Sequence, residues 1–491
     1  MISKNKIKYL DHLLLKNNSK NFLIKDSNTS NNIRQLKEKF NYLVNLLLKK
    51  KFKKDDRVLI ISNNRTEVFI IQFAVSYLGG VSSMIDDSLK DNALNYIIND
   101  FDPKFLFIDK KKNIPVQIKQ TSLQKFFFND LKFKKKSLNK IVFKRNKKDL
   151  AIVIYTSGST GTPKGIMCSH ENILFSIYSI QNSLKYNNRD NIAVFLPISF
   201  DYGLYQIYMG LISNSKIFLA KTNEISFNYF NYLKKNFITV LPLVSTHLKI
   251  LLLQIRNNKS LLKIRLITNT GSDLRHDLVS NLLKIYKKIK IFSMYGLTEC
   301  KRVSILDSQE YSNKFNSVGK AIKGTKCWII NNKGKKINKI GIKGELVVKG
   351  KNVMMGYLND ERLTSKTFKK HGRSNILLTG DICSIDRKGY LSFYGRKDDI
   401  FKYKDYRLSK KEIEKNINEI KDIQDTFVYV SKNFTNYTIF IVTRLKLETA
   451  IKKIKNKLEN YKFTENILKI KLIKRNQRGK VSKDFINKLI K

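Results

Sequence analysis

The chain has 491 residues, of which 42% are hydrophobic, and a formal net charge of +55. This length favours a large domain joined to a smaller one, and this hydrophobic content excludes a disordered chain. So basic a protein suggests nucleic acid or an anionic membrane as a partner. Here the lysines are spread over the whole length without a nucleic-acid-binding motif. We therefore attribute the charge to a bias in composition and expect no nucleic-acid partner.

Cysteine usage and the N-terminus bear on the compartment. Cys168, Cys300, Cys327 and Cys383 are far apart and form no Cys-x-x-Cys pair, which suits free thiols in a reducing compartment. Residues 1–21 are polar and rich in lysine, without the apolar core of a secretion signal. No apolar run of roughly 18 residues suggests a membrane span. We expect a cytoplasmic protein with no transmembrane segment.

Helical and strand patterns alternate through the first part of the chain. Apolar positions at helical spacing predict a helix over 33–50, and the apolar run 58–62 predicts a buried strand. A second helix is expected over 66–78, with short strands over 105–109 and 150–155. Strands that alternate with helices predict parallel sheets, so the expected fold class is α/β.

From about residue 317 the pattern changes to short strands. Turn sequences of Asn, Asp, Lys and Gly at 331–334 and 386–389 separate these strands. We expect the stretch of about 317–395 to form a β-rich subdomain, which completes a large N-terminal domain of residues 1–395.

After a hinge at 396–400 we expect a small, mobile α+β domain, residues 401–491. Its predicted elements follow in the order helix, strand, strand, helix, strand and terminal helix. The first five are expected at 409–418, 426–431, 437–443, 447–460 and 466–473.

The strongest local pattern is an apolar strand that runs into a loop of Gly, Ser and Thr with one lysine, Lys164. Glycines let the backbone turn its N–H groups toward an anion, while hydroxyls and lysine add donors and charge. It is not a Walker A loop, because Pro163 precedes the lysine and Gly165 follows it. Linkers rarely follow a buried strand, so we expect polyphosphate binding, with a helix after the loop and Ser169 as its N-cap. The expected contacts are Thr156, Ser157, Gly158, Ser159, Thr160, Gly161, Thr162 and Lys164.

The loop resembles the signature of the adenylate-forming (AMP-binding) superfamily. That superfamily includes acyl-CoA synthetases, adenylation domains of peptide synthetases, D-alanine carrier-protein ligase-like enzymes and luciferases. Its other motifs follow in order along nearly the whole chain. They are Asn-Thr-Gly at 269–271, Tyr-Gly-Leu-Thr-Glu at 295–299, Thr-Gly-Asp at 379–381, Gly-Arg-Lys-Asp at 395–398 and Gly-Lys at 479–480.

The resemblance implies where a nucleotide and a metal ion are held. It implies that Tyr295 packs on adenine, that Thr298 contacts the α-phosphate and that Glu299 holds Mg2+, a cation for which a carboxylate is a suitable ligand. It places Gly271 in a turn that lines the nucleotide site.

The later motifs are expected to complete the nucleotide site. Asp381 is expected to accept hydrogen bonds from both ribose hydroxyls. Arg396 is expected near the ribose and Arg407 near the phosphates. Asp398 would be the hinge residue, and Lys480 the catalytic lysine.

The same resemblance places an acyl pocket at Asp201, Tyr205, Thr270, Met294 and Arg302. In members that activate amino acids, an aspartate at this place pairs with the α-ammonium group; a structural or capping role is the alternative for Asp201. Lys301 and Arg302 could favour an acid with a second anionic group or could point to solvent, and we expect solvent. Cys300 is expected to be a small packing residue.

Together the motifs predict an AMP-forming acid–thiol ligase that uses ATP and Mg2+. It would adenylate a carboxylic or amino acid and pass the acyl group to the phosphopantetheine thiol of CoA or of a separate carrier protein. An amino-acid-specific carrier-protein ligase is the alternative within this class. A non-catalytic nucleotide-binding protein or a basic nucleic-acid-binding protein is the alternative outside it. One residue departs from the pattern: Asp405 stands where the family usually has a glycine along the pantetheine path.

Overall fold

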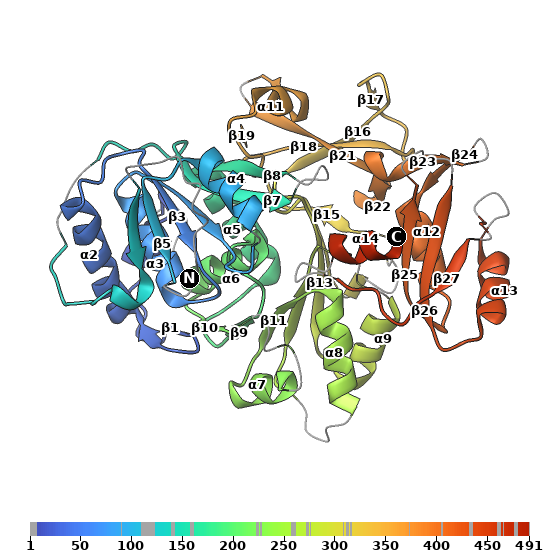
Figure 1. Ribbon diagram of the computed structural model, residues 1–491, viewed down its shortest axis with the longest axis horizontal. Coiled ribbons are helices and arrows are strands. Elements are labelled where there is room, and N and C mark those ends of the chain that lie inside the picture. Colours follow the sequence, from blue (N-terminus) through green and yellow to red (C-terminus); the bar gives the residue numbers. More distant parts are fainter. Residues whose placement is uncertain are drawn as a thin grey trace.

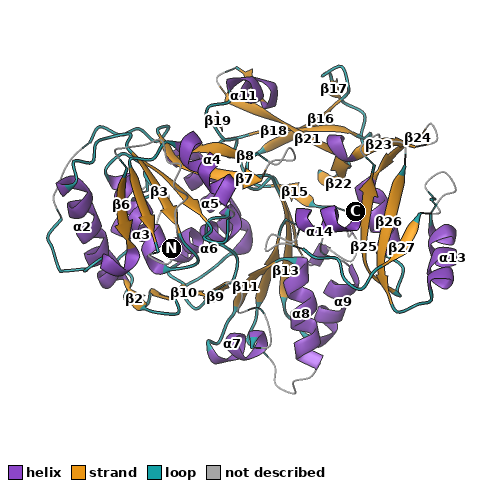
Figure 2. Ribbon diagram, viewed as in Figure 1, coloured by secondary structure: helices purple, strands orange, loops and turns teal. Residues whose placement is uncertain are grey.

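In the computed structural model the chain forms two large sheets, a short hairpin and a small third sheet (Figure 1). Helices lie against the sheets, as the colouring by secondary structure shows (Figure 2). The described residues are 7–89, 91–109, 123–138, 143–157, 162–221, 225, 228–256, 262–271, 274, 276–307, 309–310, 314, 317–372, 374–403, 406–431, 436–458, 463–464, 466–475 and 480–490.

The first sheet has seven strands, in the order β19-β8-β7-β4-β3-β5-β6. Strands β7, β4, β3, β5 and β6 run parallel, and β8 pairs antiparallel with both β7 and β19. The parallel pairing expected from the sequence is therefore confirmed. The strands are β3 (Arg57–Ile61), β4 (Val81–Ile85), β5 (Phe105–Ile108), β6 (Gln124–Phe127), β7 (Leu150–Ser157), β8 (Pro163–Ser169) and β19 (Gly356–Tyr357).

The two helices predicted in this part, α2 and α3, begin and end close to their expected positions, whereas α1 and α4 were not predicted. At the start of α2, the Asn32 side chain accepts a hydrogen bond from the backbone of Gln35 at 3.0 Å, and the Gln35 side chain accepts from the backbone of Asn32 at 2.9 Å. This reciprocal cap satisfies two N–H groups that a helix end would leave unpaired. The helices are α1 (His12–Leu15), α2 (Ile33–Lys49), α3 (Thr66–Tyr77) and α4 (Asp91–Phe101).

The second sheet has fifteen strands and two halves. In one half, β1, β10, β9, β11, β12 and β13 run parallel, with β2 antiparallel at the edge. These strands are β1 (Leu23–Lys25), β2 (Ser30–Asn32), β9 (Asn191–Val194), β10 (Lys216–Leu219), β11 (Val240–Leu243), β12 (Leu266–Asn269) and β13 (Lys290–Tyr295). The helices in this stretch of the chain are α5 (His170–Leu184), α6 (Asp201–Ser213), α7 (Tyr229–Lys235), α8 (Ser245–Arg256) and α9 (His276–Ile285), of which α5 contacts β8 of the first sheet.

The other half of this sheet is antiparallel and contains the β-rich stretch expected from about residue 317. It is hydrogen-bonded to the parallel half through the pairing of β14 with β13, so both halves form one continuous sheet. Both expected hairpin turns, at 331–334 and 386–389, are present. The strands are β14 (Ser304–Asp307), β15 (Gly319–Ala321), β16 (Lys326–Ile330), β17 (Lys336–Ile337), β18 (Gly344–Lys349), β20 (Phe368–His371), β21 (Ser374–Ile385) and β22 (Tyr390–Arg396), and the helix is α11 (Glu361–Thr367).

The segment after the Gly/Ser/Thr loop differs from expectation. The sequence predicted a helix after the loop, but strand β8 comes first because residues from Pro163 onward pair with β7 on one side and β19 on the other. The helix α5 then follows. Its expected N-cap is confirmed, since the Ser169 hydroxyl accepts a hydrogen bond from the backbone of Asn172 at 3.2 Å.

From α12 onward the C-terminal elements follow the expected order of helix, strand, strand, helix, strand and helix. A hairpin that the sequence did not predict, β23 paired with β24, comes before them. They have a separate hydrophobic cluster, whose buried members run from Phe401 to Ile467. Strand β25 contacts α8 of the preceding part, where Lys249 Nζ lies 3.7 Å from Asp425 Oδ2. The hinge at 396–400 and the domain limits stay predictions. The elements are β23 (Ile400–Tyr403), β24 (Tyr406–Ser409), α12 (Lys410–Asn418), β25 (Ile423–Val430), β26 (Tyr437–Thr443), α13 (Leu447–Lys457), β27 (Ile467–Lys469) and α14 (Lys483–Ile490).

Two further expectations concern the described part of the chain. All four cysteines are free, three of them buried, as the absence of a Cys-x-x-Cys pair indicated. Within the described ranges, no helix combines the length and the apolar character needed to cross a membrane.

Two glycines of helix α6 lie in close contact with neighbouring parts of the chain. A Cβ at Gly203 would lie 2.4 Å from the carbonyl oxygen of Pro197, whereas a Cβ at Gly210 would meet only the side chains of Ile217 and Ile192. Backbone cannot easily move aside, so Gly203→Ala should destabilise the protein by about 2 kcal/mol. Gly210→Ala should cost less, because a side chain can rotate and alanine favours a helix by about 1 kcal/mol. Melting temperatures of both variants test this, and equal values would contradict it.

Candidate active site

The Gly/Ser/Thr loop leaves the sheet at the end of β7. Thr156 is half-buried there, and Lys164 lies opposite it in β8. Lys164 Nζ is 6.0 Å from the centre of the Tyr357 ring in β19, at the outer limit of a cation–π contact. Thr162 is exposed. The predicted contacts Gly158, Ser159, Thr160, Gly161 and the side chain of Ser157 lie outside the described residues.

Glu299 lies close to the same tyrosine. The Tyr357 hydroxyl donates a hydrogen bond to Glu299 Oε1 at 2.8 Å, and the backbone N–H of Met354 donates to the Glu299 carbonyl at 2.9 Å. Tyr357 therefore lies beside both Lys164 and Glu299, which are far apart in the sequence. No sequence motif pointed to Tyr357, because its role depends on β19 pairing with β8. Thr298, next to Glu299, is half-buried.

A second group of contacts joins Tyr295, Asp381 and Arg396. Tyr295 ends β13, and its hydroxyl donates a hydrogen bond to Asp381 Oδ2. Asp381 in β21 is paired in register with Arg396 in β22, whose guanidinium lies 3.6 Å from Oδ1. Oδ1 is buried and has no hydrogen-bond partner among the described residues. It is therefore a spare acceptor, which fits the hydroxyl of a ligand.

Burial sets the protonation of this group. It raises the pKa of the Asp381 carboxyl to about 6, against the opposing effects of Arg396 and the Tyr295 hydrogen bond. Burial, reinforced by the Asp381 charge, also holds the pKa of the Tyr295 hydroxyl well above its ordinary value. Tyr295 thus keeps its proton and remains the donor.

Charged residues also gather around the start of helix α6. Asp201 is the first residue of that helix, and Lys301 Nζ lies 3.6 Å from Asp201 Oδ2. The same Nζ is 5.6 Å from the centre of the Tyr205 ring. Thr270 and Met294, the other residues expected in an acyl pocket, are buried after β12 and in β13.

The expectation that Lys301 and Arg302 point to solvent is wrong. Only 1% of the surface of Lys301 and 6% of the surface of Arg302 are exposed to solvent. The guanidinium of Arg302 lies 5.1 Å from the centre of the Tyr202 ring, and Asn352 donates hydrogen bonds to the carbonyls of Cys300 and Arg302 at 3.1 and 3.0 Å. These partners are distant in sequence, so nothing in the local pattern indicated them. Cys300 is fully buried, which fits the packing role expected for it.

Three further predicted residues can be placed by their elements, and one of them, Asp398, interacts electrostatically with Arg396. Gly271 is exposed after β12 with a φ of 81°, a conformation that favours glycine. Asp398 is exposed in a short 3-10 turn after β22. Lys480 is exposed and lies between β27 and α14, as its sequence position indicated. The side chain of Arg407 and all of Asp405 lie outside the described residues.

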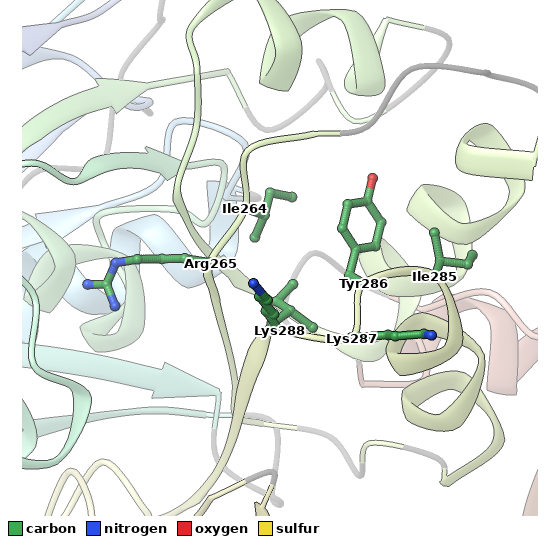
Figure 3. Close-up of a pocket in the computed structure, with 7 residues that line it drawn as sticks. Ile264, Arg265, Ile285, Tyr286, Lys287 and Lys288 are labelled. Carbon is green, nitrogen blue, oxygen red and sulfur yellow. The ribbon is translucent and has the colours of Figure 1, made fainter.

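A surface hollow of about 410 Å3 lies elsewhere (Figure 3). It is lined by residues 264–265 and 285–289, which precede β12 and β13. These two strands are parallel, so the hollow is at their amino ends, whereas Thr270 and Tyr295 are at their carboxyl ends. Ligands of open α/β sheets bind at the carboxyl ends, so we do not assign the site to this hollow.

The model of the AMP-binding enzyme family matches residues 13–358. The chain belongs to that family. Its relatives among AMP-binding enzymes include a probable CoA ligase, CCL5 of Humulus lupulus, which is 25% identical over 89% of this chain and 84% of the relative. Bacitracin synthase 2 of Bacillus licheniformis is 26% identical over 91% of this chain, but the match spans only 17% of that much longer protein.

A solved structure shows the same fold. The AMP-binding enzyme has the fold of ATP-bound MatB from Rhodopseudomonas palustris, with a TM-score of 0.84, 21% identity and coverage of 98% of each chain. The resemblance drawn from the motifs and the expected α/β fold class are thereby confirmed. The protein is an AMP-forming adenylating ligase.

The raised pKa of Asp381 predicts a pH effect on the stability of this AMP-binding enzyme. Between the ordinary pKa of 3.8 and about 6, the folded state holds more protons than the unfolded state. The free energy of unfolding should therefore fall as pH rises through this window, by on the order of 3 kcal/mol for this group. Asp381→Asn removes the titration. The melting temperature of the wild type relative to Asp381→Asn should thus be higher at pH 4 than at pH 7.

A partly exposed aspartate, Asp386, supplies the control for this pH effect. The pKa of Asp386 is lowered, against the effect of burial, by hydrogen bonds from Lys314 and the backbone. The wild type should therefore lose stability relative to Asp386→Asn as pH falls, which is the opposite sign. A difference between wild type and Asp381→Asn that does not change from pH 4 to pH 7 would refute the assignment.

Proposed function

We propose that this ligase activates a carboxylic or amino acid as its acyl-AMP and then passes the acyl group to a phosphopantetheine thiol, on CoA or on a separate carrier protein. The observation that carries the proposal is the buried Asp381, whose Oδ1 has no hydrogen-bond partner among the described residues although Tyr295 and Arg396 lie beside the carboxyl group. A carboxylate so placed matches the paired hydroxyls of a ribose.

The other nucleotide contacts would come from both sheets. Tyr295 would pack on the adenine, and Thr298 would contact the α-phosphate. The Gly/Ser/Thr loop and Lys164 would hold the phosphates, with Arg396 near the ribose and Arg407 near the phosphates. Gly271 would line the nucleotide site.

Glu299 is the residue we assign to Mg2+. Its carboxylate and the phosphate oxygens are the hard ligands that this cation prefers. The hydrogen bond from Tyr357 would orient Glu299, as outer-shell partners orient metal ligands elsewhere. When bound, Mg2+ would neutralise charge on the phosphates.

In the first step a carboxylate oxygen of the acid attacks the α-phosphorus of ATP. The bond from the α-phosphorus to the bridging oxygen breaks, and pyrophosphate leaves. Catalysis of phosphoryl transfer rests mainly on positioning and positive charge. Lys480 would contact both the acid and the α-phosphate, and Lys164 would help to hold the leaving pyrophosphate.

In the second step the thiol sulfur attacks the acyl carbon, the bond to AMP breaks, and the thiol proton is lost. Rotation of the C-terminal part about Asp398 would move Lys480 away and admit the thiol. Asp405 takes the place of the usual glycine in the expected path of the pantetheine arm. Its side chain would narrow that path and add a negative charge to it. The free cysteines support a cytoplasmic location, because thiols stay reduced there.

Lys480→Ala tests the adenylation step. Acid-dependent exchange between ATP and pyrophosphate should fall by about 100-fold or more, because a positive charge at the transition state is lost. Exposed Lys488 in α14 provides the matched control, and Lys488→Ala should keep wild-type exchange. The acids to be tried are amino acids, fatty acids and aryl acids.

Two outcomes would count against the proposal. Equal loss in both lysine variants would show that Lys480 has no special role. No exchange with any acid, in protein that binds ATP, would favour a non-catalytic binding role.

A further inference from the structure

A buried group of charges beside helix α6 is not explained by nucleotide chemistry. It consists of Asp201, Lys301 and Arg302, with the rings of Tyr202 and Tyr205, and we call it the charged cluster. The side chains of Lys301 and Asp201 retain only 2% and 5% of their exposure. Cations are rarely buried to this degree unless each has a partner.

The described residues leave the charged cluster with an excess of positive charge. It has two cations and one anion, and no carboxylate of the described residues forms an ion pair with Arg302. Glu299, the carboxylate of the same turn, accepts a hydrogen bond from Tyr357 instead. Cys168 adds no negative charge, since burial raises the pKa of its thiol.

Hydrogen-bonding capacity in the charged cluster is also unused. Lys301 Nζ and Arg302 Nε are buried and have no hydrogen-bond partner among the described residues. The Lys301–Asp201 separation of 3.6 Å is longer than a hydrogen bond. Buried polar atoms without partners call for an explanation, such as a ligand.

A purely structural ion pair explains only part of the charge in the charged cluster. Asp201 and Lys301 alone would balance each other and would not require Arg302. The reacting carboxylate of the acid does not supply the missing anion either, because Lys480 would hold it next to the α-phosphorus that it attacks. The unpaired charge thus corresponds to a second anionic group on the acid.

We propose that the acid activated by this enzyme carries a second carboxylate, which pairs with Lys301 and Arg302. Arginine and lysine bind carboxylates through short, charge-assisted hydrogen bonds. With Lys301 drawn to the second carboxylate, Asp201 would pair with an ammonium group, so an amino dicarboxylic acid would engage all three charges of the charged cluster. This inference rests on the proposed adenylation and deepens it.

Matched pairs of acids test the proposal by pyrophosphate exchange with the wild type. L-aspartate is compared with L-asparagine, and succinate with succinamate, because each pair differs mainly in one negative charge. The dicarboxylate should give the higher kcat/KM by about 30-fold or more, the effect of losing a buried charge partner. Preference for aspartate over succinate would assign the ammonium group to Asp201, and the reverse preference would still support the second carboxylate.

Variants then ask whether the charged cluster causes that preference. Lys301→Met and Arg302→Met should each bring the ratio between dicarboxylate and amide close to one, while exposed Lys323→Met should leave it unchanged. If Lys301→Met fails to fold because Asp201 is left unpaired, the double variant Asp201→Asn/Lys301→Met removes both charges, and Arg302→Met stands as an independent test.

The failure of this inference can be told apart from failure of the proposed function. Exchange with monocarboxylic acids that exceeds exchange with every dicarboxylic acid would overturn the second carboxylate and leave adenylation intact. A preference that persists in both Lys301→Met and Arg302→Met would overturn the role of the charged cluster. No exchange with any acid would overturn adenylation. The melting temperature of Lys480→Ala, measured with each acid of a matched pair, reports binding without catalysis. The dicarboxylate should raise this temperature more than its amide does, and equal rises would also contradict the proposal.

Discussion

The backbone of Gly296 lies directly against the carbonyl of Lys301. A Cβ at position 296 would be 1.8 Å from that oxygen, so no other residue fits there. This close approach makes the turn between β13 and β14 tight, and the backbone of Val303 closes it with a hydrogen bond to Tyr295 at 2.8 Å. Within the turn, Glu299 contacts Tyr357 while Lys301 contacts Asp201. The residue proposed for the metal ion and the residue proposed for the acid are thus two positions apart.

The turn can contribute residues to both sites because it lies where the large sheet changes from parallel to antiparallel pairing. Strand β13 is the last strand of the parallel half and β14 the first of the antiparallel half. The antiparallel half returns Asp381 and Arg396 to the Tyr295 side chain, and β19 brings Tyr357 to Glu299. The Asp381 carboxylate and the charged cluster around Lys301 and Arg302 both contain buried charge, which is costly. In addition, Asp381 Oδ1, Lys301 Nζ and Arg302 Nε have no hydrogen-bond partner among the described residues. A bound nucleotide and acid would offset that cost.

The outcome at particular residues shows how far the sequence could be interpreted. The Ser169 cap was predictable because a cap depends on residues three apart. Strand β8 was not, because Pro163 and Gly165 are typical of a loop and only pairing with β7 and β19 makes the segment a strand. Lys301 and Arg302 were assigned to solvent because that is where cations usually lie. Their burial depends on Asp201, Tyr202 and Asn352, which are far away in sequence.

The sequence by itself determined the family, the α/β class and the order of the motifs, because these depend on short patterns: hydrophobic periodicity, turn residues and closely spaced polar groups. Tertiary structure decided which residues meet. It placed Tyr357 beside both Lys164 and Glu299, left one oxygen of Asp381 without a hydrogen-bond partner among the described residues, and enclosed two cations with one carboxylate. The physical reason is that burial and the pairing of charges depend on contacts between residues far apart in the chain, and local sequence carries no record of those contacts.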